Sequence, residues 1–155
     1  MLIRPFSALD GAATLDVFLR AIRITASSAY APEQIAVWAP NDMDLVPWTA
    51  KRARTSTVVA TQDDRVVGFT DLDDNGYIDM LFVDPDFGRR GIASALLAWA
   101  LEQAEDQGLT ELTTHASLIA RPFFEKFGFV VLEQRYPVLG GVQLTNFSMR
   151  RPPPP

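Results

Sequence analysis

The sequence contains no cysteine and a single histidine, His115. Without cysteine the chain has no disulfide, no thiolate ligand for a metal ion and no cysteine nucleophile. A lone histidine has no second ligand of its kind, so we expect no metal site. Any transfer chemistry must therefore proceed without a cysteine-bound intermediate.

Positive charge and long apolar runs are also scarce. The net charge is −5 and no extended basic run is present, which disfavours a nucleic-acid partner. The longest uncharged apolar run, 91–101, is too short to cross a bilayer, so we expect no membrane partner. Charged residues such as Arg4 and Asp10 interrupt the first segment, which is unlike a signal peptide. We expect a cytoplasmic protein.

Length and composition indicate one folded unit. A chain of 155 residues with 48% hydrophobic and 21% charged residues is typical of a globular domain with a sizeable core. We assign residues 1–150 to a single domain and 151–155 to a proline-rich tail. The oligomeric state is open, with a homodimer as one option.

The stretch 77–108 organises the chain. Residues 77–83 are rich in aromatic and β-branched side chains, which predicts a largely buried strand. Residues 84–86 form a turn that contains proline. A helix is predicted over 89–107, with a wide apolar arc and Gly108 at the position of a C-terminal glycine cap.

The junction between this strand and this helix is suited to an anion. Gly88 and Gly91 allow a tight turn and leave the backbone amides accessible. The first N–H groups of a helix lack intrahelical partners, and the helix dipole adds partial positive charge there. Arg89 and Arg90 add full charges. The pattern predicts a site for a diphosphate.

At this junction the chain resembles the GNAT (GCN5-related N-acetyltransferase) family. The family's acetyl-CoA motif, Gln/Arg-x-x-Gly-x-Gly/Ala, is matched by Gly88-Arg89-Arg90-Gly91-Ile92-Ala93. The final Gly-x-Ala agrees with the motif. Gly88 departs from it, because the family places there a side chain often used on the pyrophosphate.

A second block, 116–129, resembles the family's late helix, whose usual form is Asn-x-x-Ala, an aromatic pair, and Glu-Lys-x-Gly-Phe. Ser117 stands at the asparagine position and Phe124 at the position of the usual catalytic tyrosine. Both are departures, and the second removes the hydroxyl that the family uses as an acid. Together with the N-terminal half, the resemblance covers nearly the whole chain.

The resemblance implies an α/β fold with a mixed, mostly antiparallel, splayed sheet of six or seven strands and helices on both faces. The cofactor would be acetyl-CoA, with its pantetheine arm between strands 77–83 and 111–115. The expected cofactor-binding residues are Leu81, Phe82, Val83, Gly88, Arg89, Arg90, Gly91, Ile92, Ala93, Ser94, Ser117 and Phe124. Ser117 has a second interpretation, as the cap of the helix that follows it.

The remaining elements follow from periodicity and from turn residues. Asp10 is expected to cap a helix that runs to about Ile24, and Pro47 to interrupt a helical segment over 42–53. A tail without regular structure is expected from Arg150. The other predicted elements are strands 2–5, 56–61, 65–72, 111–115, 129–136 and 142–149, and helices 32–38 and 118–127.

The acceptor side is predicted more weakly. Asp79 is the one carboxylate within the central strand, where it is costly unless it is paired. Alternation places it on one face with Leu81 and Val83. It is our candidate for catalysis, either by binding the amine or by removing its proton, and an ion pair is the structural alternative. Tyr30 and Trp38 are candidates for the acceptor pocket, with core packing as the alternative.

Three further features each have two interpretations. His115 is either a general base or a structural histidine. The carboxylates of Asp71, Asp73 and Asp74 either attract a cationic acceptor or form a solvated turn. Ser94 either donates to the phosphates or is an ordinary residue of the first helical turn.

The resemblance implies an N-acetyltransferase that moves an acetyl group from acetyl-CoA directly to the amine of a small molecule or peptide. The alternative is a GNAT-fold module that binds acyl-CoA without efficient catalysis, and Phe124 is the feature that favours it. Nucleotide phosphate transfer is disfavoured, because no Gly-x-x-x-x-Gly-Lys-Ser/Thr loop is present.

Overall fold

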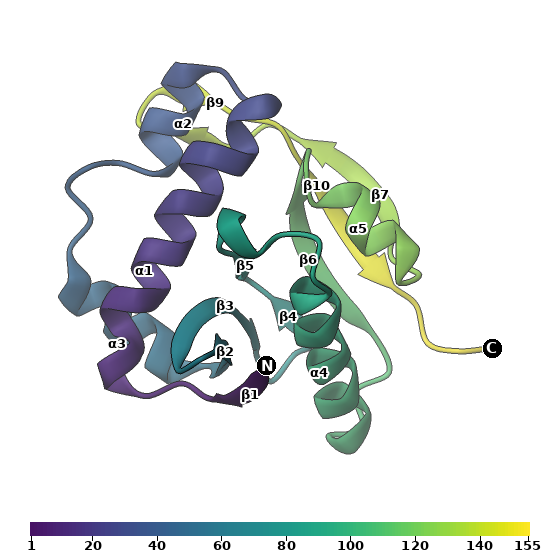
Figure 1. Cartoon of the computed structure of the whole chain (residues 1–155). Helices are drawn as coiled ribbons and strands as arrows, with labels where there is room; N and C mark the ends of the chain where they lie inside the picture. Colours follow the sequence, from purple (N-terminus) through teal and green to yellow (C-terminus); the bar gives the residue numbers. More distant parts are fainter.

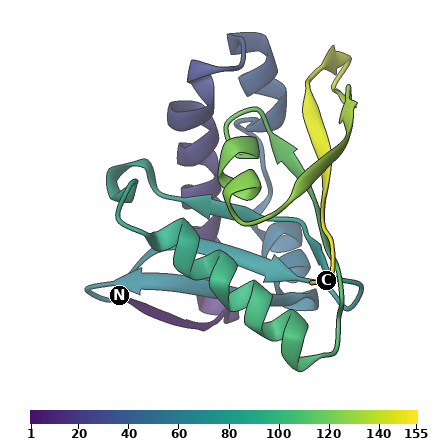
Figure 2. The ribbon, with the colours of Figure 1, turned by 90° about the vertical axis from the view of Figure 1, so that its right-hand side faces the viewer.

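The computed structural model describes residues 1–155 as a mixed α/β fold (Figures 1 and 2). The helices are α1 (Gly11–Arg20), α2 (Pro32–Trp38), α3 (Leu45–Arg54), α4 (Ile92–Asp106) and α5 (Arg121–Lys126). The strands are β1 (Leu2–Pro5), β2 (Ser56–Gln62), β3 (Arg65–Leu72), β4 (Tyr77–Ile78), β5 (Leu81–Val83), β6 (Leu112–Ser117), β7 (Val130–Arg135), β8 (Val138–Leu139), β9 (Val142–Gln143) and β10 (Asn146–Arg151).

The strands form two four-stranded sheets and one hairpin. The first sheet has the order β1-β2-β3-β5, and all its neighbours are antiparallel. The second has the order β4-β6-β10-β7, in which only β4 and β6 run parallel. The chain therefore crosses from the second sheet to the first between β4 and β5, and this crossing is the splay that the family resemblance implied.

Helices cover both faces of the first sheet, as expected (Figure 2). On one face α1 and α3 bury Phe18 and Trp48 against Phe69 of β3. On the other face α4 buries Ile92 and Leu96 against β2 and β3. A third cluster joins α4 and α5 to the second sheet. The apolar arc of α4 is wide because the helix contacts both sheets.

The prediction of one continuous strand over 77–83 is wrong, because the strand is broken at residues 79–80. The carboxylate Oδ1 of Asp71 accepts the N–H groups of Asp79 and Met80, at 2.8 and 3.1 Å. The hydroxyl of Thr70 donates to the Met80 carbonyl oxygen at 2.7 Å. One backbone bond remains here, from the Asp71 N–H to the Met80 carbonyl oxygen at 3.3 Å. The other bonds at the break come from side chains of β3, and they turn the chain from one sheet to the other.

Two predicted helices begin later than expected. α4 starts at Ile92 instead of 89, because Gly91 has a left-handed backbone (φ 80°) and ends the preceding turn. α5 starts at Arg121 instead of 118, after a turn in which the Ala120 N–H donates to Ser117 Oγ at 3.0 Å.

Two details of the N-terminal helices also differ. Pro47 does not interrupt α3, because it lies in the first turn, where no intrahelical donor is lost. Asp10 does not cap α1 with its side chain. Its carboxylate instead accepts two hydrogen bonds from the Arg4 guanidinium and one from the Ser7 N–H.

The C-terminal region contains more strands than predicted. Strand 142–149 is divided into β9 and β10, and β8 pairs with β9 in a hairpin. β10 continues to Arg151, so the tail begins at Pro152 and not at Arg150. Together with the break of strand 77–83, these changes give ten strands where six or seven were expected.

Candidate active site

A cavity of about 810 Å³ opens where the two sheets diverge. Its walls come from α1, the β4–β5 break, the loop before α4, β6, α5 and the β8–β9 region. It collects eleven of the predicted site residues: Tyr30, Trp38, Asp79, Leu81, Phe82, Val83, Gly88, Arg89, Ala93, Ser117 and Phe124. Cofactor-side and acceptor-side candidates therefore meet in one space.

Strand β5 forms one wall and has a free edge. It is the last strand of the first sheet and pairs only with β3, with Phe82 opposite Phe69 and Val83 opposite Gly68. The edge that faces away from β3 has backbone N–H and C=O groups without a strand partner. An amide-bearing chain laid along this edge would satisfy them as an added strand does.

The glycine turn before α4 leads into the same cavity. Gly88 and Arg89 line it, and Arg89 has a left-handed backbone (φ 60°). A Cβ built on Gly91 would meet nothing within 4 Å, so the space beside this backbone is open. The N–H groups of the first turn of α4 have no acceptor within the helix. This turn has the open backbone and the charge that a diphosphate requires.

Four predicted cofactor residues do not line the cavity: Arg90, Gly91, Ile92 and Ser94. The Ile92 side chain is buried in the core against β2 and β3. The Arg90 guanidinium lies over the Phe87 ring, 5.0 Å from its centroid. Gly91 and Ile92 lie at the start of α4, so what they offer a ligand is backbone.

The opposite wall comes from β6 and α5. Phe124 is buried and contacts Phe129 with ring centroids 5.0 Å apart. No hydroxyl exists at this position. The Ser117 hydroxyl accepts the Ala120 N–H in the turn before α5. Ser117 does not cap α5, because the N-cap of that helix is Ala120 and has no side-chain hydrogen bond. Ser117 also lines the cavity.

Tyr30 and Trp38 form the aromatic end of the cavity. Their rings contact edge to face with centroids 5.2 Å apart. The Tyr30 hydroxyl is fully used: it donates to the Thr145 carbonyl at 2.6 Å and accepts the Leu118 N–H at 3.0 Å. Tyr30 is thus a buried link between the β6–α5 turn and β10, and its ring lines the cavity as well.

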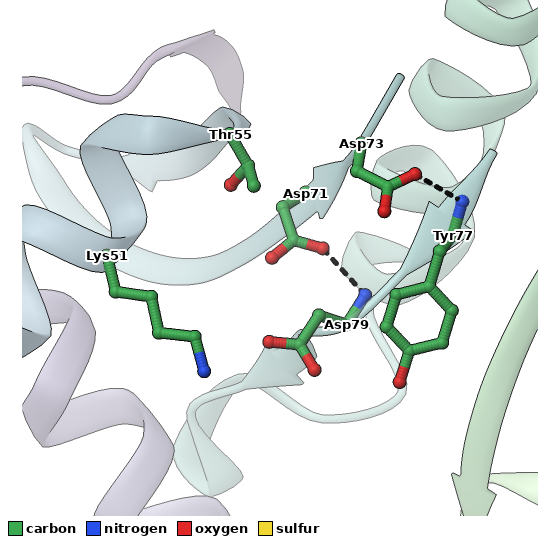
Figure 3. A pocket seen from close by; sticks show the side chains of 6 residues that line it. All are labelled: Lys51, Thr55, Asp71, Asp73, Tyr77 and Asp79. Atoms are coloured by element: carbon green, nitrogen blue, oxygen red, sulfur yellow. Dashed lines mark hydrogen bonds between the residues drawn. The ribbon is translucent and has the colours of Figure 1, made fainter. Parts of the chain in front are cut away.

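A second pocket of about 270 Å³ lies beside the break (Figure 3). It is lined by Lys51, Thr55, Asp71, Asp73, Tyr77 and Asp79. Tyr77 and Asp79 line both this acidic pocket and the larger cavity. In Figure 3 the Asp79 carboxylate lies beside the Tyr77 ring, and Lys51 extends toward it from α3. The two spaces therefore meet at these two side chains.

Asp79 is more accessible than a strand interior would allow. Its side chain is 37% exposed, and one oxygen lies 3.7 Å from Nη2 of Arg52. The alternation that grouped Asp79 with Leu81 and Val83 does not hold, because the break separates them. A long ion pair and partial exposure leave the carboxylate available to a ligand.

Two buried charged residues, Asp71 and Arg52, contact Asp79. Burial raises the pKa of Asp71 to about 6, although the N–H groups of Met80 and Asp79 oppose the shift. Arg52 is 1% exposed, and its Nε and Nη1 atoms have no hydrogen-bond partner. Its guanidinium lies over the Trp48 ring, 4.5 Å from the centroid, and burial lowers its pKa. Arg52 thus balances the Asp71 and Asp79 carboxylates from beneath the pocket.

Sequence reasoning did not connect Tyr77 with His115. The two residues are 38 positions apart, yet the Tyr77 hydroxyl lies 3.2 Å from His115 Nδ1. Both line the main cavity. A parallel register between strands 77–83 and 111–115 would have brought them together, but neither motif nor spacing indicates that register.

No group of three or more His, Cys, Asp or Glu side chains is placed to hold a metal ion. None of the helices has the length and hydropathy of a membrane span.

Comparisons with known proteins confirm the resemblance. The acetyltransferase (GNAT) domain model matches residues 26–151. The chain is 40% identical over 151 residues to the uncharacterized N-acetyltransferase YafP of Escherichia coli K12. The aligned region covers 97% of this chain and 95% of that protein.

Solved structures of N-acetyltransferases have a similar fold. A GCN5-related N-acetyltransferase from Rhodopseudomonas palustris has a TM-score of 0.93 and 30% identity, over 97% of this chain and 94% of that one. The PaiA N-acetyltransferase of Thermoplasma acidophilum, in complex with coenzyme A, has a TM-score of 0.78 and 20% identity, over 97% and 98%. The chain therefore belongs to the GNAT family of acetyltransferases.

Proposed function

We propose that this chain transfers an acetyl group from acetyl-CoA directly to the amine of a small molecule or peptide. The observation that carries the proposal is the position of Asp79. Its carboxylate lies at the break between β4 and β5, where the large cavity and the acidic pocket meet. A carboxylate at this point can bind an ammonium group and assist the loss of its proton.

The cofactor side of the cavity fits acetyl-CoA. The turn from Gly88 to Ser94 offers backbone N–H groups and Arg89 for the diphosphate. The free edge of β5 offers hydrogen bonds to the amides of the pantetheine arm. In this proposal the backbone N–H groups near Leu81 polarise the thioester carbonyl. When bound, acetyl-CoA supplies the activated acetyl group.

The acceptor side combines aromatic surface and negative charge. Tyr30 and Trp38 provide flat apolar walls to the cavity. Asp79 adds negative charge where the cavity meets the acidic pocket, which Asp71 and Asp73 also line. An amine that is cationic in solution would be attracted to this charge, and its apolar part would contact the two rings.

The rival function is a GNAT-fold module that binds acyl-CoA without efficient catalysis. Phe124 favours it, because the buried ring supplies no hydroxyl where the family has its acid. Release of free CoA thiol separates the two functions. A sensor binds acetyl-CoA but releases thiol no faster when amines are added.

The test is an acetylation screen over amines, amino acids, polyamines and peptides, with free-thiol release as the measurement. Asp79→Asn removes one charge at the meeting point, and we expect turnover to fall by about 10²-fold or more. The dissociation constant of CoA should stay within about twofold, a difference under about 0.5 kcal/mol. Asp74→Asn, in the exposed turn of the same segment, is the matched control and should leave both unchanged.

Absence of amine-dependent thiol release across the screen, with acetyl-CoA bound, would favour the sensor. Equal losses of turnover and CoA affinity in Asp79→Asn would instead give Asp79 a structural role.

A further inference from the structure

The side chains of Tyr77 on β4 and His115 on β6 contact each other across two neighbouring strands of the second sheet. β4 and β6 run parallel here, with Tyr77 opposite Thr113 and Ile78 opposite Thr114. The Tyr77 hydroxyl lies 3.2 Å from His115 Nδ1, and the rings meet edge to face with centroids 5.5 Å apart. The Ile78–Thr114 pair that follows is the last between β4 and β6 before the chain crosses to the first sheet.

The pair faces the reacting region. Both rings line the main cavity, and Tyr77 also lines the acidic pocket together with Asp79. His115 is exposed to this space, so its Nε2 atom is free to exchange protons with solvent. The chain has no other histidine, and Phe124 supplies no acid or base.

The other phenols are less suited to proton transfer. The Tyr30 hydroxyl is buried and occupied by two hydrogen bonds. Tyr136 is exposed and lines neither the cavity nor the acidic pocket. Tyr77 is therefore the tyrosine that reaches both spaces and has a titratable partner.

We propose that Tyr77 and His115 form a proton relay that takes the proton of the attacking amine, with the Tyr77 hydroxyl as the bridge and the His115 imidazole as the acceptor. The inference rests on the proposed acetyl transfer and adds the route of the proton. Asp79 then binds the amine and stabilises the imidazolium, and both tasks use its negative charge.

The amine, which binds as a cation, first loses one proton to solvent. Its neutral nitrogen then bonds to the acetyl carbon, and the carbon–sulfur bond breaks with its electron pair left on sulfur. The nitrogen gives one proton to Tyr77 Oη as Tyr77 gives its own proton to His115 Nδ1. The imidazolium then loses a proton through solvent to the thiolate, so one amide and one thiol are the net products.

The electrostatics of the pair suit these roles. Burial and the positive charge of Arg135 lower the pKa of His115, while Asp79 and Glu133 oppose that shift. The imidazole is therefore neutral at neutral pH and can accept a proton. Burial and the Asp79 carboxylate raise the pKa of Tyr77 to about 12, so its hydroxyl stays protonated and donates to Nδ1.

The test compares His115→Asn, Tyr77→Phe and the double variant by the pH dependence of kcat/KM. Asparagine keeps a hydrogen-bond acceptor close to the Nδ1 position and removes its basicity. We expect each single variant to lower kcat by about 10²-fold and the double variant to be no worse, because the residues act as a unit. The acid limb of the parent should contain a component controlled by His115 that is absent from His115→Asn, while a component from Asp71, whose pKa is about 6, should remain in both proteins.

Two further measurements do not depend on turnover. Because His115 is the only histidine, its ring titration is directly assignable by NMR, and we expect a pKa below the ordinary value of 6.5 that changes in Tyr77→Phe. The CoA dissociation constant should be unchanged in all variants. Tyr136→Phe is the control, since it removes an exposed phenol outside both spaces.

Two results would overturn the relay alone: an acid limb in His115→Asn that is identical to that of the parent, or a Tyr77→Phe variant with parental kcat. Absence of amine-dependent thiol release by the parent chain is a different result, and it would overturn the proposed function and the relay together.

Discussion

The N–H group of Asp79 donates to the carboxylate of Asp71 at 2.8 Å, so one acidic residue holds the backbone of another at the point where the strand breaks. The same Asp71 oxygen accepts the next N–H, from Met80. The accessible carboxylate in the candidate site is thus positioned by a buried one on β3. The consequences of this link are measurable.

Removal of the Asp71 acceptor should disturb the break. Asp71→Ala leaves two N–H groups without their partner, and we expect a loss of stability of about 1–3 kcal/mol together with weaker CoA binding and slower turnover. Asp71→Asn keeps an oxygen acceptor and should retain CoA binding. Urea denaturation and calorimetry are the measurements. Equal effects of the two substitutions would show that the charge, and not the acceptor, holds the break.

Asp71 also makes stability depend on pH. Its pKa is raised from 3.8 to about 6 in the folded chain. The folded state therefore binds more protons than the unfolded state between these values, and the free energy of unfolding should fall as pH rises from about 4 to about 6. The shift corresponds to about 3 kcal/mol.

The control for this pH effect is Asp71→Asn, which cannot titrate. The free energy of unfolding of the variant minus that of the parent should increase as pH rises from about 4 to about 6, and it should stay constant at higher pH. Urea denaturation at a series of pH values measures the difference. A difference independent of pH would contradict the raised pKa.

Gly91 provides a test of the anion site. A glutamate here places a negative charge beside the expected diphosphate, so Gly91→Glu should abolish CoA binding in calorimetry. Gly91→Ala is the control: its Cβ meets no atom, and the left-handed backbone costs about 1–2 kcal/mol of stability. Parental affinity in a folded Gly91→Glu protein would place the diphosphate elsewhere.

Phe124→Tyr restores the hydroxyl that the family usually has. The thiolate is a weak base, with a reference thiol pKa of about 8.5, so it can depart without a neighbouring acid. We expect CoA binding to be kept and turnover to be equal or higher. Thiol release and calorimetry check both. If CoA binding is lost while the fold survives, Phe124 packs against the thiol arm and the position is not a vacant acid site.

The family and the glycine turn before α4 were predictable from sequence. Gly88, Gly91 and the apolar arc of α4 are neighbours along the chain, and the turn they form depends on local backbone geometry. The block around Ser117 and Phe124 is local in the same sense. Most strands were predictable one by one, because alternation and turn residues indicate each element separately.

The tertiary structure decided the features that depend on distant residues. The break at 79–80 exists because Thr70 and Asp71, on another strand, bond to that backbone. The pairing of Tyr77 with His115 depends on the parallel register of β4 and β6, which no local pattern specifies. Propensity predicts that 77–83 is extended, but hydrogen bonds from across the sheet determine where it stops pairing. That competition between local preference and long-range contacts creates the cavity at the sheet junction.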